Sequence, residues 1–541
     1  MKEVIEKIIS QSTIELKNQE NWPDFEMSII EVDYPKNEAF GDFTTNVAMS
    51  LGRLAKKNPL EIAEKLSAVI SQKSSIKNIF EKVEVVVPGY INFHFSAKYL
   101  QDKVAQINKQ KEKFGDSEVG RGMKINNEFI SANPTGPLHL GNGRGGFYGD
   151  SISQVLKKVG FEVVKEYYVN DAGEQILKLG HSVLKDTEAV YSGEYIDKLN
   201  EEFVGKFNDV KELSAAAALR VLENIIKITV KDKMKIEMDN YFSEKDLHVP
   251  TENKDGKIGE AIEILKDKKF IYENEGAMWL KTTEFGDDKD RVLVKTDSQK
   301  TYFASDCGYL LSKKERGFDK IIEIWGADHH GYVNRFRAAA EALGFQKKQV
   351  KFIIVQLVKL VKDGKEVRMS KRAGNVVSID ELIEKVGHDV TRFFFLMYSP
   401  DTHMNFDLGL AEERSEKNPV FHVQYAHARI CSILQKAADL GMDAKNADLT
   451  KLIHEKELML MRELDKFPAL VAETAETYEV HKLPYYAIRL ADKFHSFYND
   501  LKVIDADSLE LSVARLKLIE ATKIVLRETL RLIGVSAPDR M

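Results

Sequence analysis

Short strands alternate with helical segments from residue 123 onward, and this alternation limits the fold more than any other feature of the sequence. The pattern predicts strands at KINNEFIS (124–131), FEVVKEYYV (161–169), 320–325 and 351–358, with a helix over 147–159. Neighbouring parallel strands need a crossover, which is usually a helix. The middle of the chain is therefore expected to form a doubly wound parallel sheet with helices on both faces.

The first 112 residues have a different pattern and predict a small α+β domain. They begin with a helical segment, and VEVVVPGYINFHF (83–95) is broken at Pro88-Gly89, which predicts two strands around a turn. The charged stretch 103–122 has few apolar residues and predicts a linker, with a domain boundary near 113. A chain of 541 residues also needs several domains, because single cores stop growing at roughly 250 to 300 residues.

Two further regions are predicted to be helical. Between about 170 and 265 the sequence is highly charged and helical, which indicates an insertion into the sheet domain. Beyond residue 407, apolar residues at helical spacing predict a bundle; examples are Val513, Leu516, Ile519, Leu526, Leu530 and Ile533. The expected domains are therefore 1–112, 113–406 and 407–541.

Composition excludes several classes of protein. Apolar residues make up 43% and charged residues 30% of the chain, as in globular proteins. The apolar stretch 352–361 is interrupted by polar residues and is too short to span a membrane, and the N-terminus lacks the apolar core of a signal peptide. We therefore expect a cytoplasmic protein.

Cys307 and Cys431 cannot make a four-cysteine site, so structural zinc is not expected. The net charge of −6 does not decide whether a nucleic acid binds.

The loop SANPTGPLHLGNGRGG (131–146) lies between a predicted strand and a predicted helix. It places His139, Asn142 and several backbone N–H groups at a helix N-terminus, where the dipole favours phosphate oxygens. Gly141, Gly143 and Gly146 also fit the dinucleotide pattern G-x-G-x-x-G, and Glu166 follows about 20 residues later as that fold requires.

The dinucleotide interpretation has a weakness. Ten residues, 131–140, separate the strand from the first glycine, whereas a dinucleotide turn passes almost directly from strand to glycine. We therefore favour a phosphate site of another kind, and a nicotinamide-dependent oxidoreductase remains an alternative.

A second glycine-flanked loop, GKEVRMSKRAGN (364–375), is basic. By itself such a run is usually a solvated surface. Together, however, HLGN (139–142) and RMSKR (368–372) resemble the HIGH and KMSKS signatures of class I aminoacyl-tRNA synthetases. Asn142 replaces the second histidine and can still donate a hydrogen bond, while Arg368 and Arg372 replace a lysine and a serine.

This resemblance implies a Rossmann-like catalytic domain that uses ATP with Mg²⁺. The implied catalytic residues are His139, Asn142 and Lys371. The implied ATP-binding residues are His139, Gly141, Asn142, Asp328, His329, Met369, Ser370 and Lys371. In WGADHHGYV, Asp328, His329 and His330 also include metal-ligand types, but adjacent histidines on a tight turn rarely reach one ion, so no protein-ligated metal is expected.

Within that class, the chain resembles the arginyl-tRNA synthetases over nearly its whole length. The resemblance implies that Glu128, Ser131, Asn133, Tyr302 and Asp306 contact the substrate amino acid. A guanidinium presents five donors in a planar fork, so a pocket with two carboxylates suits it. Taken singly, Glu128 could be a strand-end surface acid and Asp306 a helix N-cap.

The same resemblance implies contacts with transfer RNA. Tyr90 and Asn92 in the N-terminal domain are expected to read a base of the elbow, in the D-loop, since aromatic stacking and edge hydrogen bonds are how unpaired bases are read. Tyr425 and Arg429 are expected to contact the anticodon. Ordinary strand alternation at Tyr90 and core packing of Tyr425 remain alternatives.

The expected activity is the ATP-dependent ligation of L-arginine to tRNA(Arg) through arginyl-adenylate, by a monomer. A synthetase for another amino acid would lack the set Glu128, Tyr302 and Asp306. An inactive RNA-binding paralogue is a further alternative, which an assay with ATP and arginine would distinguish.

Overall fold

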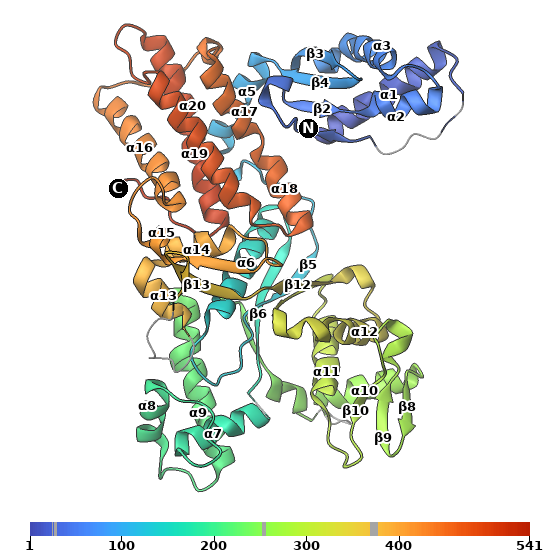
Figure 1. The fold of residues 1–541 in the computed structure, drawn as a ribbon, viewed down its shortest axis with the longest axis vertical. Helices are drawn as coiled ribbons and strands as arrows, with labels where there is room; N and C mark the ends of the chain where they lie inside the picture. The colour runs from blue at the N-terminus through green and yellow to red at the C-terminus, as the bar shows by residue number, and fades with distance from the viewer. Residues whose placement is uncertain (24, 26–29, 172, 251–255, 368–376) are drawn as a thin grey trace.

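A computed structural model describes residues 1–23, 25, 30–171, 173–250, 256–367 and 377–541. The expected loop residues Met369, Ser370 and Lys371 therefore lie outside the described residues. In Figure 1 the N-terminal domain lies beside the C-terminal helices, and the catalytic sheet lies below them.

A five-stranded parallel sheet forms the centre of the molecule. Its strands are β5 (Lys124–Glu128), β6 (Glu162–Val169), β7 (Asn240–Ser243), β11 (Lys320–Gly326) and β12 (Val350–Val355). Their order is β12-β11-β5-β6-β7, and every neighbouring pair is parallel. The helix α6 (Leu140–Lys158) crosses from β5 to β6. The prediction of a doubly wound parallel sheet is confirmed. Because the chain turns to opposite sides of β5, the switch point, where such folds bind ligands, lies at the carboxyl ends of β5 and β11.

The crossover from β6 to β7 is helical, but it ends earlier than expected. It contains α7 (Glu174–Leu184), α8 (Glu194–Phe203) and α9 (Val210–Val221), followed by π-helical segments at Leu222–Ile226 and Thr229–Lys233. The region 170–265 is therefore not one helical insertion as the sequence pattern predicts, because β7 lies within it and pairs with the main sheet. A strand of four residues inside a charged stretch is too short to give a periodic signal.

The part of the chain from β7 to β12 forms a second hydrophobic core. It contains α10 (Gly256–Asp267), α11 (Tyr302–Glu315), α12 (Val333–Leu343) and a small antiparallel sheet, β8 (Ile271–Asn274), β9 (Ala277–Leu280) and β10 (Arg291–Val294). The sequence analysis did not identify this sheet.

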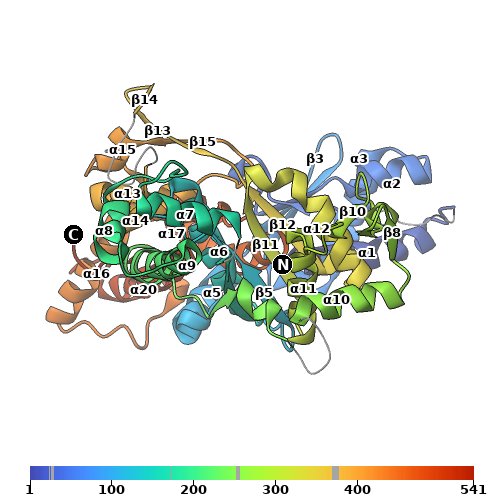
Figure 2. The same cartoon turned by 90° about the horizontal axis from the view of Figure 1, so that it is seen from below.

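The region after β12 forms a third layer. β13 (Val358–Lys362) pairs with β14 (Lys365–Glu366) and, in parallel, with β15 (Met404–Asp407). Figure 2 shows these strands together with α15 (Leu408–Glu412) on one side of the molecule. The helices α13 (Ile379–Val386) and α14 (His388–Leu396) lie between β14 and β15 in the sequence.

The N-terminal domain combines helices with an antiparallel sheet, as expected. Its strands β1 (Val32–Asp33), β2 (Phe43–Thr45), β3 (Phe80–Val86) and β4 (Tyr90–Phe95) have the order β1-β2-β4-β3. Its helices are α1 (Lys2–Gln19), α2 (Val47–Ala55), α3 (Pro59–Gln72) and α4 (Ser74–Lys77). The predicted pair of strands around Pro88-Gly89 is β3 and β4, so that prediction is confirmed.

The expected linker is wrong over its first part, because 103–110 belongs to α5 (Ala97–Gln110). Leu100, Val104 and Ile107 are fully buried on one face of this helix. The helix packs against the C-terminal bundle. Three apolar residues at helical spacing were enough to form it, although charged residues surround them.

The C-terminal region is the predicted helical bundle. It contains α16 (Pro419–Asp439), α17 (Glu455–Asp465), α18 (Phe467–Thr477), α19 (Lys482–Asp500) and α20 (Leu509–Leu532). The last of these packs against α16, α17 and α19. Among the described helices, none is both long enough and apolar enough to cross a membrane.

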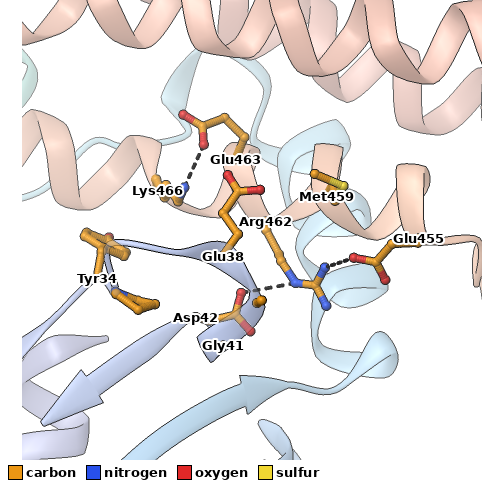
Figure 3. A pocket seen from close by; sticks show the side chains of 11 residues that line it. Tyr34, Glu38, Gly41, Asp42, Glu455, Met459, Arg462, Glu463 and Lys466 are labelled. Atoms are coloured by element: carbon orange, nitrogen blue, oxygen red, sulfur yellow. Dashed lines mark hydrogen bonds and ion pairs between the residues drawn. The ribbon is translucent and has the colours of Figure 1, made fainter.

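A pocket of about 250 Å³ lies between the N-terminal domain and α17 (Figure 3). Asp42 of the N-terminal domain pairs with Arg462 of the bundle, with Oδ1 and Nε 3.2 Å apart. Elsewhere on this contact the Tyr99 hydroxyl donates to Asp465 (3.0 Å) and Lys493 pairs with Glu38 (2.8 Å). Polar pairs therefore join the first and last domains directly.

Candidate active site at the switch point

His139 begins α6 and forms a capping box with Asn142. Its Nδ1 accepts hydrogen bonds from the backbone N–H groups of Gly141 (3.1 Å) and Asn142 (3.3 Å), and the Asn142 amide oxygen accepts from the His139 N–H (3.1 Å). Desolvation by the surrounding chain lowers the pKa of His139, while the charge of Asp328 acts in the opposite direction. The ring is therefore neutral at pH 7. Since Nδ1 accepts, the hydrogen-bond pattern assigns the proton to Nε2, which can donate to a ligand.

The segment after the RMSKR sequence is attached to this loop. Ser378 forms an antiparallel bridge with His139, and the Ile379 N–H donates to the Leu138 carbonyl (2.9 Å). Ser378 also caps α13. The chain just beyond the second class I signature is thus joined to the loop at the α6 N-terminus, although more than 200 residues separate the two in sequence.

Arg144, which the sequence analysis did not single out, is almost completely buried in the first turns of α6. Its guanidinium donates to the carbonyls of Gln356 (2.8 Å), Thr402 (2.9 Å) and Ser399 (2.7 Å). Burial lowers the pKa of Arg144 to about 10. This side chain fixes α6 against the connections that flank β13 and β15.

The glycines of the loop serve helix packing. A Cβ on Gly143 would lie 2.5 Å from Ile379 Cδ1, and one on Gly146 would lie 2.6 Å from Met234 Cε. Glu166, the acid that a dinucleotide site would use for ribose, is fully buried. Although burial opposes its ionisation, hydrogen bonds led by that of Arg316 lower the pKa of Glu166 to about 2. Close packing and an internal ion pair therefore account for the features that resembled a dinucleotide site.

Glu128 ends β5 at the switch point, and its carboxylate is buried. Its Oε1 accepts from the Ser131 hydroxyl (3.0 Å), which in turn accepts from the Tyr168 N–H (3.0 Å). Ile130 and Ser131 have φ values of 70° and 38°, a region that side-chain-bearing residues rarely adopt. Such backbone strain concentrates at functional sites. Glu128 is thus a buried acid at the carboxyl end of β5 and not a surface acid.

Asp306 lies inside α11 and does not cap it; the cap is Thr301, whose side chain accepts from the Ala304 N–H. The Tyr332 hydroxyl donates to the Asp306 carboxylate. Burial raises the pKa of Asp306 to about 7, the charges of Glu244 and Glu128 add to the shift, and the Tyr332 hydrogen bond opposes it. The charge of Arg335 acts in the same direction as that hydrogen bond, but among the described residues no cation forms an ion pair with this carboxyl group.

The remaining residues expected to bind substrate follow β5 or β11 or begin α11. Tyr302, the first residue of α11, is 57% exposed, and its hydroxyl accepts from the Glu174 N–H (3.4 Å). Asn133 donates through Nδ2 to the Gln175 amide oxygen (2.5 Å). Asp328 and His329 follow β11 on an exposed 3₁₀ turn, with Asp328 Oδ2 and His329 Nε2 3.4 Å apart.

A buried charge network supports Glu128, and the sequence analysis missed it. Its members are Tyr309 and Lys313 on α11, Arg316 directly after α11, and Glu323 on β11. Lys313 resembled an ordinary basic residue near a helix end. The one sequence feature that could have indicated this network is Glu323, a charged residue inside the apolar strand KIIEIWG.

The residues expected to bind RNA lie on the two outer domains. Tyr90 is 40% exposed on β4, whereas Asn92 is 2% exposed and its amide oxygen accepts from the Thr44 hydroxyl (2.6 Å). Tyr425 is 44% exposed, so it is not a core residue, and Arg429 one turn later on α16 donates to its hydroxyl.

Among the described residues, one His/Cys/Asp group has the spacing of metal ligands: His427, Cys431 and Asp539. His427 Nδ1 is engaged by the Pro538 carbonyl (2.9 Å), and Asp539 lies 3.5 Å from Arg527 and 3.8 Å from Lys523. Cations beside the carboxylate disfavour a metal ion. The group instead docks the C-terminal tail on α16.

Three family models match consecutive parts of the chain. They are the arginyl tRNA synthetase N terminal domain (residues 2–95), the catalytic domain of class I (R) tRNA synthetases (103–393) and the DALR anticodon binding domain (423–541). The chain is 43% identical over 539 residues to the arginine–tRNA ligase of Listeria welshimeri, covering 96% of each chain. It is 42% identical to that of Bacillus licheniformis, covering 100% of this chain and 99% of that relative.

The fold agrees with these relatives. The Thermus thermophilus arginyl-tRNA synthetase superposes with a TM-score of 0.78 at 20% identity, and the match covers all of both chains. The catalytic model alone spans more than half of the sequence. The chain therefore belongs to the arginyl-tRNA synthetase family of class I aminoacyl-tRNA synthetases.

Proposed function

We propose that arginyl-adenylate forms at the switch point, between the His139 cap and the carboxylates of Glu128 and Asp306. The family ligates arginine to transfer RNA with ATP, and this chain is an arginine–tRNA ligase. The observation that carries the assignment of the pocket is Asp306, a half-buried acid whose pKa is raised to about 7 and which forms an ion pair with no cationic partner among the described residues. A guanidinium would supply that partner.

Arginine recognition would use both acids from different directions. Glu128 belongs to β5 and Asp306 to α11, so their positions are set by the sheet and by the helix packed against it. The hydroxyl of Tyr302 and the amide of Asn133 lie on adjacent segments and would add uncharged contacts to the substrate. A pocket with acids on two sides suits a planar, multidentate cation better than a compact ammonium.

The phosphates of ATP would lie at the α6 N-terminus. His139 Nε2 and the Asn142 amide can donate there, Gly141 allows close backbone approach, and Asp328 and His329 border the place for the nucleoside. Lys371 would meet charge that develops on the leaving pyrophosphate, with Met369 and Ser370 beside it. ATP would enter as its Mg²⁺ complex, in which the ion reduces the charge on the phosphates.

Two displacements complete the reaction. An arginine carboxylate oxygen attacks the α-phosphorus, and pyrophosphate leaves with the electrons of the broken P–O bond. A terminal ribose hydroxyl of tRNA(Arg) then attacks the adenylate carbonyl, loses its proton and releases AMP. Positioning and charge stabilisation can carry the first step without a protein base.

The RNA would contact both outer domains of a cytoplasmic monomer. Tyr90 is available for stacking, and Asn92 would need to exchange its bond with Thr44 to read a base. Tyr425 and Arg429 present an aromatic ring and a guanidinium on α16, with the guanidinium 5.1 Å from the ring centre. Such a pair suits an unpaired anticodon base.

The assignment is tested by kcat/KM for arginine, lysine and citrulline in wild type, Glu128→Gln and Asp306→Asn. A buried cation left short of a partner costs roughly 3 to 5 kcal/mol, so each variant should lose about 10²- to 10⁴-fold for arginine. Lysine and citrulline, which lack either the planar fork or the charge, should be poor substrates of wild type. Citrulline use equal to arginine use, or normal kinetics in both variants, would place the pocket elsewhere.

A further inference from the structure

The ammonium group of Lys313 is fully buried beside the proposed arginine pocket. It lies 2.7 Å from Glu128 Oε2 and 2.6 Å from Glu323 Oε1. Burial opposes its charge, but the carboxylates of Glu128, Glu323 and Glu166 raise the pKa of Lys313. The residue is therefore an ammonium ion between two buried carboxyl groups, and burial together with the charge of Glu128 raises the pKa of the second, Glu323.

The other donors near Glu128 cannot replace it. The Tyr309 hydroxyl lies 2.8 Å from Glu128 and 2.6 Å from Glu166, and it has one hydrogen for the two carboxylates. Arg316 satisfies Glu166 but not Glu128. Within the described part of the chain, Lys313 is thus the cation that pairs with Glu128 and holds it in place.

These contacts fix how Glu128 can meet a substrate. A carboxylate offers about four acceptor directions. Lys313 and Tyr309 occupy two of them on Oε2, and Ser131 occupies one on Oε1. A carboxylate held this way cannot rotate freely, and about one direction remains for an N–H group of the substrate.

We infer that Lys313 is a positioning residue for arginine: anchored by Glu323, it holds the Glu128 carboxylate in the orientation that receives the guanidinium. It acts through Glu128 and does not touch the substrate. The inference rests on the proposed role of Glu128 in the arginine pocket.

The first test compares two neighbouring lysines. Lys313→Met should raise the KM for arginine by about 30- to 100-fold, as expected for the loss of a buried charge-assisted contact, and leave the KM for ATP and kcat within about threefold. Lys314→Met is the matched control, because Lys314 follows on the same helix but bonds to the Leu343 carbonyl instead (2.6 Å). Its arginine KM should stay at the wild-type value.

The second test uses pH to separate positioning from general damage. Without Lys313, Glu128 and Glu323 would lie together with no shared cation, and like charges in contact favour protonation of one of them. The charged and titratable groups that face Glu128 are Asp306, Tyr309, Arg316, Glu166, Tyr168 and Glu323. The arginine KM of Lys313→Met should therefore still fall between pH 8 and pH 9, where wild type is flat. Lys313→Met/Glu323→Gln, which removes the second carboxylate, should have a lower arginine KM at pH 7 than Lys313→Met.

Including Glu128→Gln in the same series separates the two hypotheses. If Glu128→Gln leaves the arginine KM unchanged, the proposed pocket itself is wrong. The positioning role is overturned if Glu128→Gln raises the arginine KM but folded Lys313→Met does not. It is also overturned if Lys313→Met raises the KM for ATP as much as the KM for arginine. Should Lys313→Met fail to fold, Glu323→Gln decides, since losing the anchor of Lys313 should still raise the arginine KM about fivefold and an unchanged value would refute the inference.

Discussion

The carboxyl group of Asp306 governs how the proposed site responds to pH. Its pKa is raised to about 7 in the empty pocket, whereas an ordinary aspartate ionises near pH 3.9. A guanidinium binds the ionised form. Below pH 7 the acid must first lose its proton, so the KM for arginine should rise about tenfold for each pH unit below 7 and become flat above pH 8.

The measurement is arginine KM from pH 5.5 to 8.5 in wild type and Asp306→Asn. Asparagine cannot titrate, so the arginine KM of Asp306→Asn should be higher than that of wild type but should not change with pH around 7. Arginine binding should also release protons from wild type near pH 7, which calorimetry in buffers of different ionisation enthalpy would detect. A flat wild-type profile would show that Asp306 is ionised before arginine arrives.

At the scale of elements, the contact between α6 and α13 joins the first signature region to the helix that follows the second in sequence. Gly143 permits it, because a Cβ there would lie 2.5 and 2.6 Å from two atoms of Ile379. Gly143→Ala should push α13 away from the His139 cap. We expect a roughly tenfold lower rate of adenylate formation and a destabilisation of about 1 to 3 kcal/mol, typical of overpacking.

Gly145→Ala is the matched control on the same helix, since its nearest neighbour, Ile324 Cγ2, would be 4.0 Å from the added Cβ. Alanine is also a better helix former than glycine by about 1 kcal/mol. This variant should keep wild-type kinetics and an equal or higher Tm. Equal losses in both variants would mean that the α6 backbone, and not its contact with α13, is what the substitution disturbs.

At the scale of the whole molecule, the N-terminal domain is held against the anticodon-binding bundle by polar pairs. Asp42 is nearly buried at this contact, and Arg462 lies 3.2 Å from it. Arg462→Ala removes the cation from a buried carboxylate and should loosen the relative orientation of the domains. If one RNA bridges both domains, the KM for transfer RNA should rise about three- to tenfold while the KM values for arginine and ATP stay unchanged.

Glu455→Gln provides the control, because Glu455 pairs with the same arginine but is largely exposed, and exposed ion pairs contribute about 0 to 1 kcal/mol. Its transfer-RNA kinetics should match wild type. A normal transfer-RNA KM in Arg462→Ala would show that this contact does not set the geometry in which the RNA binds.

Local patterns determined much of this protein. The alternation after residue 123 predicts the parallel sheet, and spacing beyond 407 predicts the helical bundle, because hydrophobic periodicity is set by residues close in sequence. The cap by His139 and Asn142 is likewise local, since its hydrogen bonds join residues within three positions. Where the local signal was brief, as in β7 or the small sheet β8–β10, the pattern did not identify the element.

Only the tertiary structure decided which charges meet. Lys313 and Glu128 are 185 positions apart, and Arg462 reaches Asp42 across the whole chain. Nothing near Lys313 in the sequence distinguishes it from Lys314, yet one is buried between carboxylates and the other bonds a helix-end carbonyl. The reason is physical: burial and partners depend on how crossovers bring distant segments together, and the free energy of a charge depends on those partners more than on its neighbours in the chain.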